Sequence, residues 1–200
     1  MKTEIAGKKE IERIVQVLKN GGIIVYPTET SYGIGADALN KKAVLKVHKV
    51  KMQSTSKPIS IIVPSIEVAK KIGKMDNDAE KLVKKFMPGP LTLVVEKQKN
   101  VPSVLSKKTI AFRISSNKTA NAIAKKFNGA ITATSANLHG EGPIYSFKKA
   151  LRIFDGKVDL IVDAGNLPKS RASTIYDIAN RKLVRKGNVS EKDILKVIGG

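Results

Sequence analysis

The stretch that decides the fold is GGIIVYPTETSYGIGADALN, residues 21–40. The apolar run Ile23–Tyr26, which follows two glycines, is typical of a buried strand. It leads directly into the polar turn Thr28–Tyr32, which carries four hydroxyls and a carboxylate and is followed by Gly33 and Gly35. A connection that only reversed the chain would need one or two turn residues. The surplus of polar groups therefore predicts a binding surface at the end of a strand.

Helical and strand patterns alternate on both sides of this stretch. Helices are expected near residues 11–18, 41–50, 66–72, 77–87, 117–127 and 146–154, and from about 190. Strands are expected at residues 23–26, 59–63, 91–96, 109–115, 130–134, 159–164, 173–178 and 182–186. The interleaving predicts an α/β or α+β fold in which helices pack against one large, twisted, mixed sheet. Without repeats or linkers, residues 1–200 are expected to form a single domain.

The composition excludes several classes of site. The chain of 200 residues has no cysteine, so it contains no disulfide, thiolate nucleophile or Cys-ligated metal. Its only imidazoles are those of His48 and His139, and we expect the latter to lie at the surface. No apolar run has the length of a membrane span, and the N-terminus lacks the apolar centre of a secretory signal. We expect a soluble, cytoplasmic protein.

The charge is strongly unbalanced. Lys and Arg number 37 and Asp and Glu number 17, which gives a formal net charge of +20. Such an excess favours nucleic acids or phosphorylated small molecules as partners. A general enrichment in lysine is the alternative, but it usually raises Glu as well. The few aromatic residues do not suggest a stacking platform for single strands.

Strand 109–115 places polar groups on one face. Because side chains alternate along a strand, Ile110, Phe112 and Ile114 share one face, and Arg113 and Thr109 lie on the other. Arg113 is then either a solvated arginine on an exposed face or part of a site.

Other polar groups follow the remaining strands. If the chain stays extended, Ala133, Ser135 and Asn137 share a face. The crevice at the carboxyl ends of strands commonly binds ligands in α/β proteins, so we expect these loops to meet in one cleft. The cleft would also include four residues from other segments, namely Lys51, Lys57, Ser173 and Arg185.

This inventory favours chemistry on phosphates. Paired carboxylates suited to glycoside hydrolysis and a Ser-His-Asp arrangement are both missing from the predicted cleft. Hydroxyls, amides and cations hold phosphates, where catalysis depends on positioning and charge neutralisation. The chain has no GxxxxGK[ST] motif and no GxGxxG motif after a strand, so it is neither a P-loop nucleotidase nor a Rossmann dinucleotide-binding protein.

An ordered set of motifs carries a family resemblance over nearly the whole chain. YPTETSYGIGADA, K-x-x-x-x-x-K-P before an apolar strand, MPGPLTLVV, FRIS, TATSAN, ASTIYD and VRKG follow one another. In order and spacing this set resembles the YrdC-type threonylcarbamoyl-adenylate synthases. The resemblance implies the YrdC-like, dsRNA-binding-like fold.

The resemblance also implies an activity. Members of the family are nucleotidyltransferases that convert L-threonine, bicarbonate or CO2, and ATP into threonylcarbamoyl-AMP and pyrophosphate. The product is used to modify adenosine 37 of tRNA by a threonylcarbamoyl-transfer machinery. Mg²⁺ accompanies ATP and is bridged by its phosphates, so no metal ligands are expected from the protein. Threonine supplies the nucleophile, so no catalytic side chain is expected either.

The matching positions imply two groups of contacts. Those expected to contact threonine are Thr30, Arg113 and Ser173, and Arg113 would clamp the carboxylate. Those expected to contact ATP are Lys51, Gln53, Lys57, Thr109, Ser135, Asn137 and Arg185. Gln53 departs from the family, which usually has arginine there. A glutamine amide donates hydrogen bonds but cannot neutralise a phosphate.

Two other functions are compatible with the same scaffold. One is a module that binds double-stranded RNA or tRNA without synthase activity, for which a charge of +20 is ample. The other is a carbamoylating relative of the hydrogenase-maturation type. The absence of zinc-finger cysteines and accessory domains counts against the second.

Overall fold

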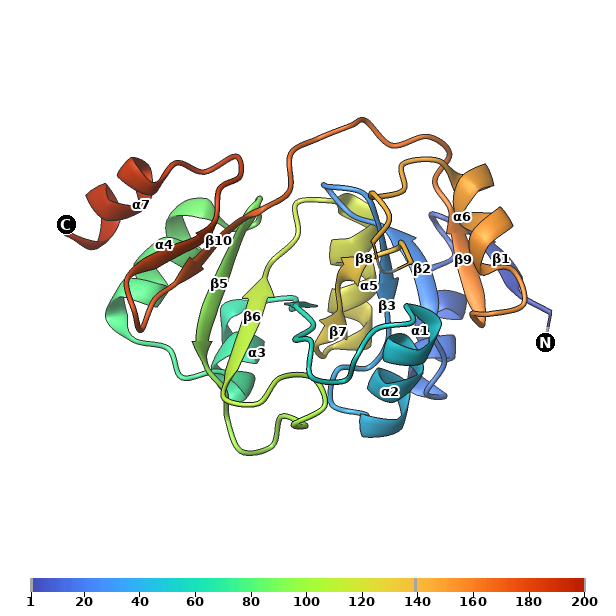
Figure 1. The fold of residues 1–200 in the computed structure, drawn as a ribbon, viewed down its shortest axis with the longest axis horizontal. Helices are drawn as coiled ribbons and strands as arrows, with labels where there is room; N and C mark the ends of the chain where they lie inside the picture. Colours follow the sequence, from blue (N-terminus) through green and yellow to red (C-terminus); the bar gives the residue numbers. More distant parts are fainter. Residues whose placement is uncertain (1, 139, 200) are drawn as a thin grey trace.

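A computed structural model describes residues 2–138 and 140–199 of the chain (Figure 1). The strands are β1 Glu4–Gly7, β2 Ile24–Pro27, β3 Tyr32–Gly35, β4 Ile61–Ile62, β5 Leu91–Glu96, β6 Thr109–Arg113, β7 Ile131–Thr132, β8 Thr134–Ser135, β9 Leu160–Asp163, β10 Thr174–Asp177 and β11 Lys182–Arg185. The helices are α1 Ile11–Lys19, α2 Lys41–Val50, α3 Ile66–Ile72, α4 Asn77–Phe86, α5 Lys118–Phe127, α6 Phe147–Phe154 and α7 Glu191–Ile198. The predicted helices are all present, to within a residue or two at their ends.

The strands form two sheets, so the prediction of one large sheet was wrong. The first sheet has the order β1-β9-β2-β3-β8, and the second has the order β11-β10-β5-β6-β4-β7. Each sheet contains both parallel and antiparallel pairs, such as β1 with β9 and β2 with β3 in the first. The predicted mixed α/β class is therefore confirmed. The two sheets occupy opposite ends of the long axis in Figure 1.

The polar turn of the opening stretch joins two strands of the first sheet. Tyr32–Gly35, which we expected to be loop, is the strand β3 and pairs antiparallel with β2. Its glycines make room for an aromatic ring, since a Cβ at Gly35 would lie 2.8 Å from Cε1 of Tyr26. Tyr26 is fully buried, and its hydroxyl donates to the carbonyl of Thr132 at 2.9 Å. Glycine in a strand here marks a close approach rather than a turn.

A short segment links the two sheets. β7 belongs to the second sheet and β8 to the first, with only Ala133 between them. The amide of Ala133 donates to the carbonyl of Ser60 at 2.8 Å, and the amide of Thr132 donates to that of Ala36 at 2.9 Å. Adjacent residues of one segment thus bond to both halves of the fold, which fixes the distance between the sheets at this point.

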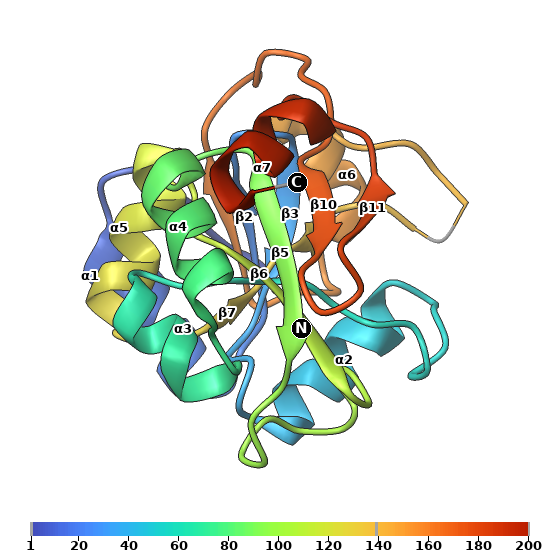
Figure 2. The same cartoon turned by 90° about the vertical axis from the view of Figure 1, so that its left-hand side faces the viewer.

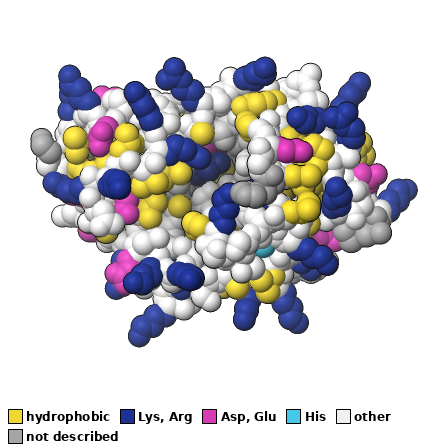
Figure 3. All heavy atoms as spheres, in the orientation of Figure 1, with side chains coloured by type: hydrophobic (Ala, Val, Ile, Leu, Met, Phe, Trp, Pro, Cys, Tyr) yellow, Lys and Arg dark blue, Asp and Glu magenta, His cyan; other side chains and the backbone are white. Residues whose placement is uncertain are grey.

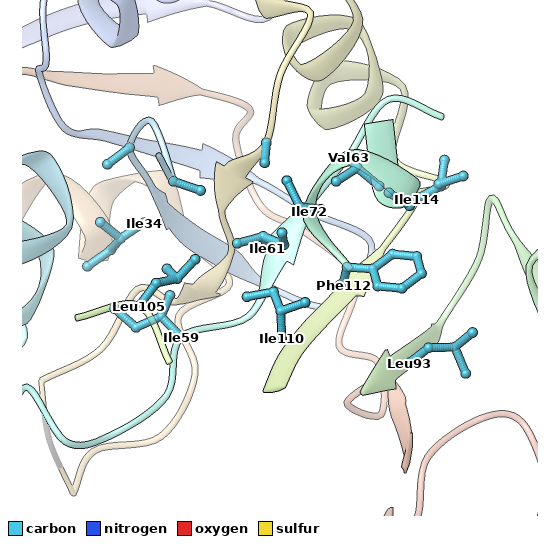
Figure 4. Close-up of a cluster of buried hydrophobic side chains, with 14 of the residues drawn as sticks. Ile34, Ile59, Ile61, Val63, Ile72, Leu93, Leu105, Ile110, Phe112 and Ile114 are labelled. Atoms are coloured by element: carbon cyan, nitrogen blue, oxygen red, sulfur yellow. The ribbon is translucent and has the colours of Figure 1, made fainter. Parts of the chain in front are cut away.

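Buried side chains from both sheets form the core. Figure 4 shows part of it, where Ile59 and Ile61 lie near Ile110 and Phe112. A second cluster lies between the first sheet and the helices α1 and α5, which pack on each other. In Figure 2, α1, α3, α4 and α5 lie on one side of β5, and β10, β11 and α2 lie on the other.

We find no helix of sufficient length and apolar character to cross a membrane in the described ranges.

Candidate active site

A cleft of about 600 Å³ lies between the two sheets. Figure 3 shows the hollow near the middle of this face, with Lys or Arg side chains beside it. Its walls come from the turn after β2, from β6, β8, β10 and β11, and from the residues just before β10. The predicted site residues that line it are Thr30, Thr109, Arg113, Ser135, Ser173 and Arg185. The predicted convergence of strand ends is therefore confirmed for these residues.

Arg113 lines the cleft from β6 and is 5% exposed. The predicted alternation is confirmed, because Thr109 also faces the cleft and Phe112 lies in the core. Nε of Arg113 donates to Oε1 of Glu29 at 2.6 Å. Within the described ranges no protein acceptor is recorded for either Nη nitrogen. Arg113 is thus a buried, oriented cation whose Nη donors are available to a ligand. The alternative of a solvated arginine on an exposed face was wrong.

The sequence analysis did not identify Glu29 as part of the site. Its second carboxylate oxygen, Oε2, accepts a hydrogen bond from Oγ of Ser115, so both oxygens are used. Ser115 is fully buried at the end of β6. The available signal was the presence of one carboxylate in a turn otherwise made of hydroxyls.

The hydroxyls of the turn have two different roles. Oγ1 of Thr28 donates to the carbonyl of Ser31 at 2.8 Å, and Oγ of Ser31 donates to the carbonyl of Tyr32 at 3.1 Å. These groups close the turn on itself, as in other hydroxyl-rich turns. Thr30 lines the cleft, and its hydroxyl lies 3.1 Å from that of Thr28. Thr28 and Ser31, which also line the cleft, therefore hold the shape of the turn that carries Thr30.

Ser173 and Arg185 form one unit on the second sheet. Nε of Arg185 donates to the carbonyl of Ser173 at 3.0 Å, and one Nη donates to its Oγ at 3.0 Å. The hydroxyl of Ser173 also lies 2.8 Å from that of Thr92. Burial, and secondarily the charge of Arg113, lowers the pKa of the Arg185 guanidinium. The two arginines therefore act on each other electrostatically in the same cleft.

Gly187 explains how this unit is held. A Cβ at Gly187 would lie 2.4 Å from the carbonyl oxygen of Ala172 and from the amide nitrogen of Thr174. Only glycine lets the chain after β11 approach the backbone around Ser173 so closely. The VRKG motif thus fixes Arg185 against Ser173.

Lys51 and Asn137 contact each other rather than the cleft. Lys51 is 4% exposed, and its Nζ donates to the carbonyl of Asn137 at 3.0 Å, to its Oδ1 at 3.2 Å and to the carbonyl of Ser135. Neither Lys51 nor Asn137 lines the cleft. Burial, and secondarily the charge of Lys57, lowers the pKa of Lys51 to about 8. The ammonium group has three donors, and all are used to hold the loop that carries Ser135.

Gln53 and Lys57 also lie outside the cleft lining. Nε2 of Gln53 lies 3.2 Å from Nδ1 of His48, and Nε2 of His48 lies 2.9 Å from the carbonyl of Val104. A carbonyl only accepts, so Nε2 of His48 carries the hydrogen and Nδ1 accepts from Gln53. His48 is buried beside Gln53 and has a structural role. The other histidine, His139, lies outside the described residues.

The chain is similar in sequence to a known family and to several named proteins. The profile of the Sua5/YciO/YrdC family, described as "Telomere recombination", matches residues 16–187. A protein of Pyrococcus abyssi named threonylcarbamoyl-AMP synthase is 34% identical over 187 residues, 91% of this chain and 55% of the relative. A protein of Coxiella burnetii with the same name is 30% identical over 180 residues, 88% of this chain and 97% of the relative.

The fold has a close match among solved structures. The crystal structure of P. abyssi Sua5 complexed with L-threonine superposes with a TM-score of 0.92 and 32% sequence identity. The match covers 98% of this chain and 61% of the Sua5 chain. The chain thus spans a little over half the length of the P. abyssi relative and almost the whole length of the C. burnetii relative.

Proposed function

The chain belongs to the Sua5/YciO/YrdC family, and from this premise we propose that it is a threonylcarbamoyl-AMP synthase. As a nucleotidyltransferase, it would condense L-threonine, bicarbonate or CO2, and ATP, and release pyrophosphate. The names of the relatives and the L-threonine in the Sua5 complex support a synthase over a module that only binds RNA.

The observation that carries this proposal is the state of Arg113. A buried arginine whose Nε is paired and whose two Nη nitrogens have no partner in the described ranges is ready to bind an anion. The fork of Nη donors matches a carboxylate in geometry and charge. We assign it to the carboxylate of L-threonine, with Thr30 and Ser173 as further contacts from the lining of the same cleft.

The reaction itself needs little from side chains. The amine of threonine adds to CO2 and loses a proton, which gives a carbamate. An oxygen of this carbamate attacks the α-phosphorus of ATP, and the bond from that phosphorus to the bridging oxygen breaks, with its electrons leaving on pyrophosphate. The substrates therefore supply the nucleophile and the leaving group. The protein orients them and neutralises charge.

We assign two hydroxyls and one guanidinium to the nucleotide. Thr109, Ser135 and Arg185 line the cleft and offer donors suited to phosphates. Lys51 and Asn137 would act by holding Ser135 in place. Gln53 and Lys57 would reach ATP only if the loop that carries them moved toward the cleft.

We propose Mg²⁺ as the cofactor, carried by ATP. Asp177 is the carboxylate among the lining residues, and Glu29 is already paired with Arg113. In the described ranges, no three His, Cys, Asp or Glu side chains gather into a group that could hold a metal. This donor set fits an ion whose ligands are phosphate oxygens and water. Mg²⁺ would neutralise charge on the triphosphate.

The proposal extends to the use of the product. Threonylcarbamoyl-AMP would pass to a transfer machinery that modifies tRNA, and the net charge of +20 favours direct contact with that tRNA. Because ATP and tRNA meet inside the cell, we propose a cytoplasmic location. No membrane partner is proposed.

The test is pyrophosphate release from ATP with and without L-threonine and bicarbonate. We expect release only when both are present, together with formation of threonylcarbamoyl-AMP in the same samples. Release that ignores threonine, or none at all in the presence of measurable RNA binding, would refute the synthase and favour the binding module.

A further inference from the structure

Glu29 connects three separate segments of the chain. It lies in the turn between β2 and β3 of the first sheet, but its side chain bonds Arg113 and Ser115 at the end of β6 in the second sheet. Its carbonyl accepts a hydrogen bond from Oγ of Ser170 at 2.9 Å. Ser170 lies in the connection from β9 to β10, which crosses the top of the molecule in Figure 1.

We propose that Glu29 is a positioning residue that sets the direction and the net charge of the Arg113 site. This inference rests on the proposed function and adds to it a residue that does not touch the substrate. Glu29 is absent from the cleft lining, and both of its carboxylate oxygens accept hydrogen bonds. It therefore has no free oxygen with which to act as a base.

The direction of Arg113 follows from which nitrogen is bonded. Nε of Arg113, the guanidinium nitrogen nearest the aliphatic part of the side chain, donates to Oε1 of Glu29 at 2.6 Å. Because the guanidinium is planar and rigid, fixing Nε leaves the pair of Nη donors at the far edge. The side chains of the pair are only 6% and 11% exposed, so water screens the contact weakly. Arg113 is thus held in the orientation that a carboxylate needs.

The net charge of the site follows from the same pair. Arg113 and Arg185 share the cleft, and burial together with the charge of Arg113 lowers the pKa of Arg185. Two unbalanced guanidiniums would both attract the triphosphate of ATP. Glu29 balances the charge of Arg113, so a multiply charged phosphate prefers Arg185. A single carboxylate still binds Arg113 through the two Nη donors.

The first measurement is L-threonine binding by isothermal titration calorimetry on the full chain. We expect Glu29→Gln to weaken binding about 10-fold, as befits a lost charge-assisted contact. Arg113→Ala should weaken it about 100-fold or more. In the double variant Glu29→Gln, Arg113→Ala, binding should be no weaker than in Arg113→Ala alone, because Glu29 acts only through Arg113.

The second measurement tests the charge. Inorganic pyrophosphate should compete with L-threonine for binding to the Glu29→Gln variant but not for binding to the wild type. Only in the variant is the positive charge of Arg113 not balanced by a carboxylate. A residue that merely supports the fold would not change this competition. Equal behaviour of the two proteins toward pyrophosphate would overturn the charge role.

The controls separate the possible failures. Glu96→Gln makes the same change in the exposed pair of Glu96 with Lys74 and should leave binding unchanged. If Glu29→Gln does not fold, Ser115→Ala removes one partner of Glu29 and should weaken threonine binding about 3-fold. Losses that add fully in the double variant would overturn positioning by Glu29. A wild type that binds no L-threonine would instead overturn the proposed function.

Discussion

The lining of the cleft and the loop 51–57 outside it are built differently. In the cleft, the ion pair of Arg113 with Glu29 and the bonds of Arg185 to Ser173 arise from strands and tight turns. In the loop, Lys51 bonds the segment 135–137 and Gln53 bonds His48. Arg113 and Arg185 face the cleft, whereas the side chains of Lys51 and Gln53 are engaged outside it.

The difference teaches how each substrate is recognised. Strand-borne side chains are placed before the substrate arrives, so binding costs them little conformational entropy. Side chains in the loop 51–57 must exchange an existing contact for one to the nucleotide. We therefore expect the cleft around Arg113 to be sensitive to single substitutions and the loop 51–57 to be tolerant.

The largest effect is expected for Arg113→Ala. The substitution removes the buried guanidinium assigned to the threonine carboxylate, so the apparent free energy of L-threonine binding should weaken by about 2 to 5 kcal/mol. The measurement is the dependence of pyrophosphate release on the threonine concentration. The control is Arg13→Ala, since Arg13 forms ion pairs with Glu4 and Glu10 and all three are largely exposed. That variant should match the wild type. An unchanged threonine dependence in Arg113→Ala would show that the cleft around Arg113 is not preformed for threonine.

A somewhat smaller effect is expected for Gly187→Ala. The new methyl would lie 2.4 Å from backbone atoms of Ala172 and Thr174, which cannot rotate away. We expect the free energy of unfolding to fall by about 1 to 3 kcal/mol in a urea titration, with weaker binding of threonine. Gly142→Ala is the matched control, because nothing lies within 4 Å of a Cβ there. Equal stability of the two variants would argue against a tightly held Ser173.

Lys51 gives a prediction about pH. Its pKa is about 8 in the folded chain, against an ordinary value of 10.5. Between these values the unfolded chain binds more protons, so folding is favoured as the pH rises from 8 to 10.5, and this gain is lost as the pH falls through 8. Relative to that of Lys51→Met, the free energy of unfolding of the wild type should rise by on the order of 1 to 2 kcal/mol between pH 8 and 10.5, as measured in urea titrations. Parallel curves for the two proteins would mean that Lys51 titrates as an exposed lysine.

The smallest effect is expected for Gln53→Arg. Gln53 faces His48 and not the cleft, so an arginine there gains no phosphate contact unless the loop moves. The affinity for ATP should change by less than about 3-fold. A gain of tenfold or more, the size of a new charge-assisted hydrogen bond, would show that this loop closes over the triphosphate. Rescue of Lys57→Ala by Gln53→Arg would locate both residues at the same phosphate.

Local patterns were enough to predict most of the fold. Helical spacing identified α2 at Lys41–Val50, and alternation along β6 placed Thr109 and Arg113 on one face. β3 was missed because glycines usually mark turns, whereas Gly35 here accommodates the ring of Tyr26. The division into two sheets was missed as well, since pairing between strands distant in the sequence leaves no local signal.

The site was predictable where a strand dictated direction. Arg113, Ser173 and Arg185 reach the cleft because they lie in strands or next to them. Lys51 was expected in the cleft, yet it is buried at the end of α2, where three acceptors surround its ammonium group. Glu29 was not identified, because its role depends on two residues more than 80 positions away.

The pairing of the first sheet has a consequence for how the chain folds during synthesis. β1 and β2 both pair with β9, so the pairs of Glu4 and of Ile24 with Leu160 cannot form until β9 has been synthesised. On the ribosome, the hairpin of β2 and β3 can form early. The edge of β2 that pairs with β9 stays unpaired until about four fifths of the chain has been made. Contacts so distant in sequence slow folding and leave an apolar strand edge available to other chains. The nascent chain is therefore most prone to aggregation between the synthesis of β3 and that of β9.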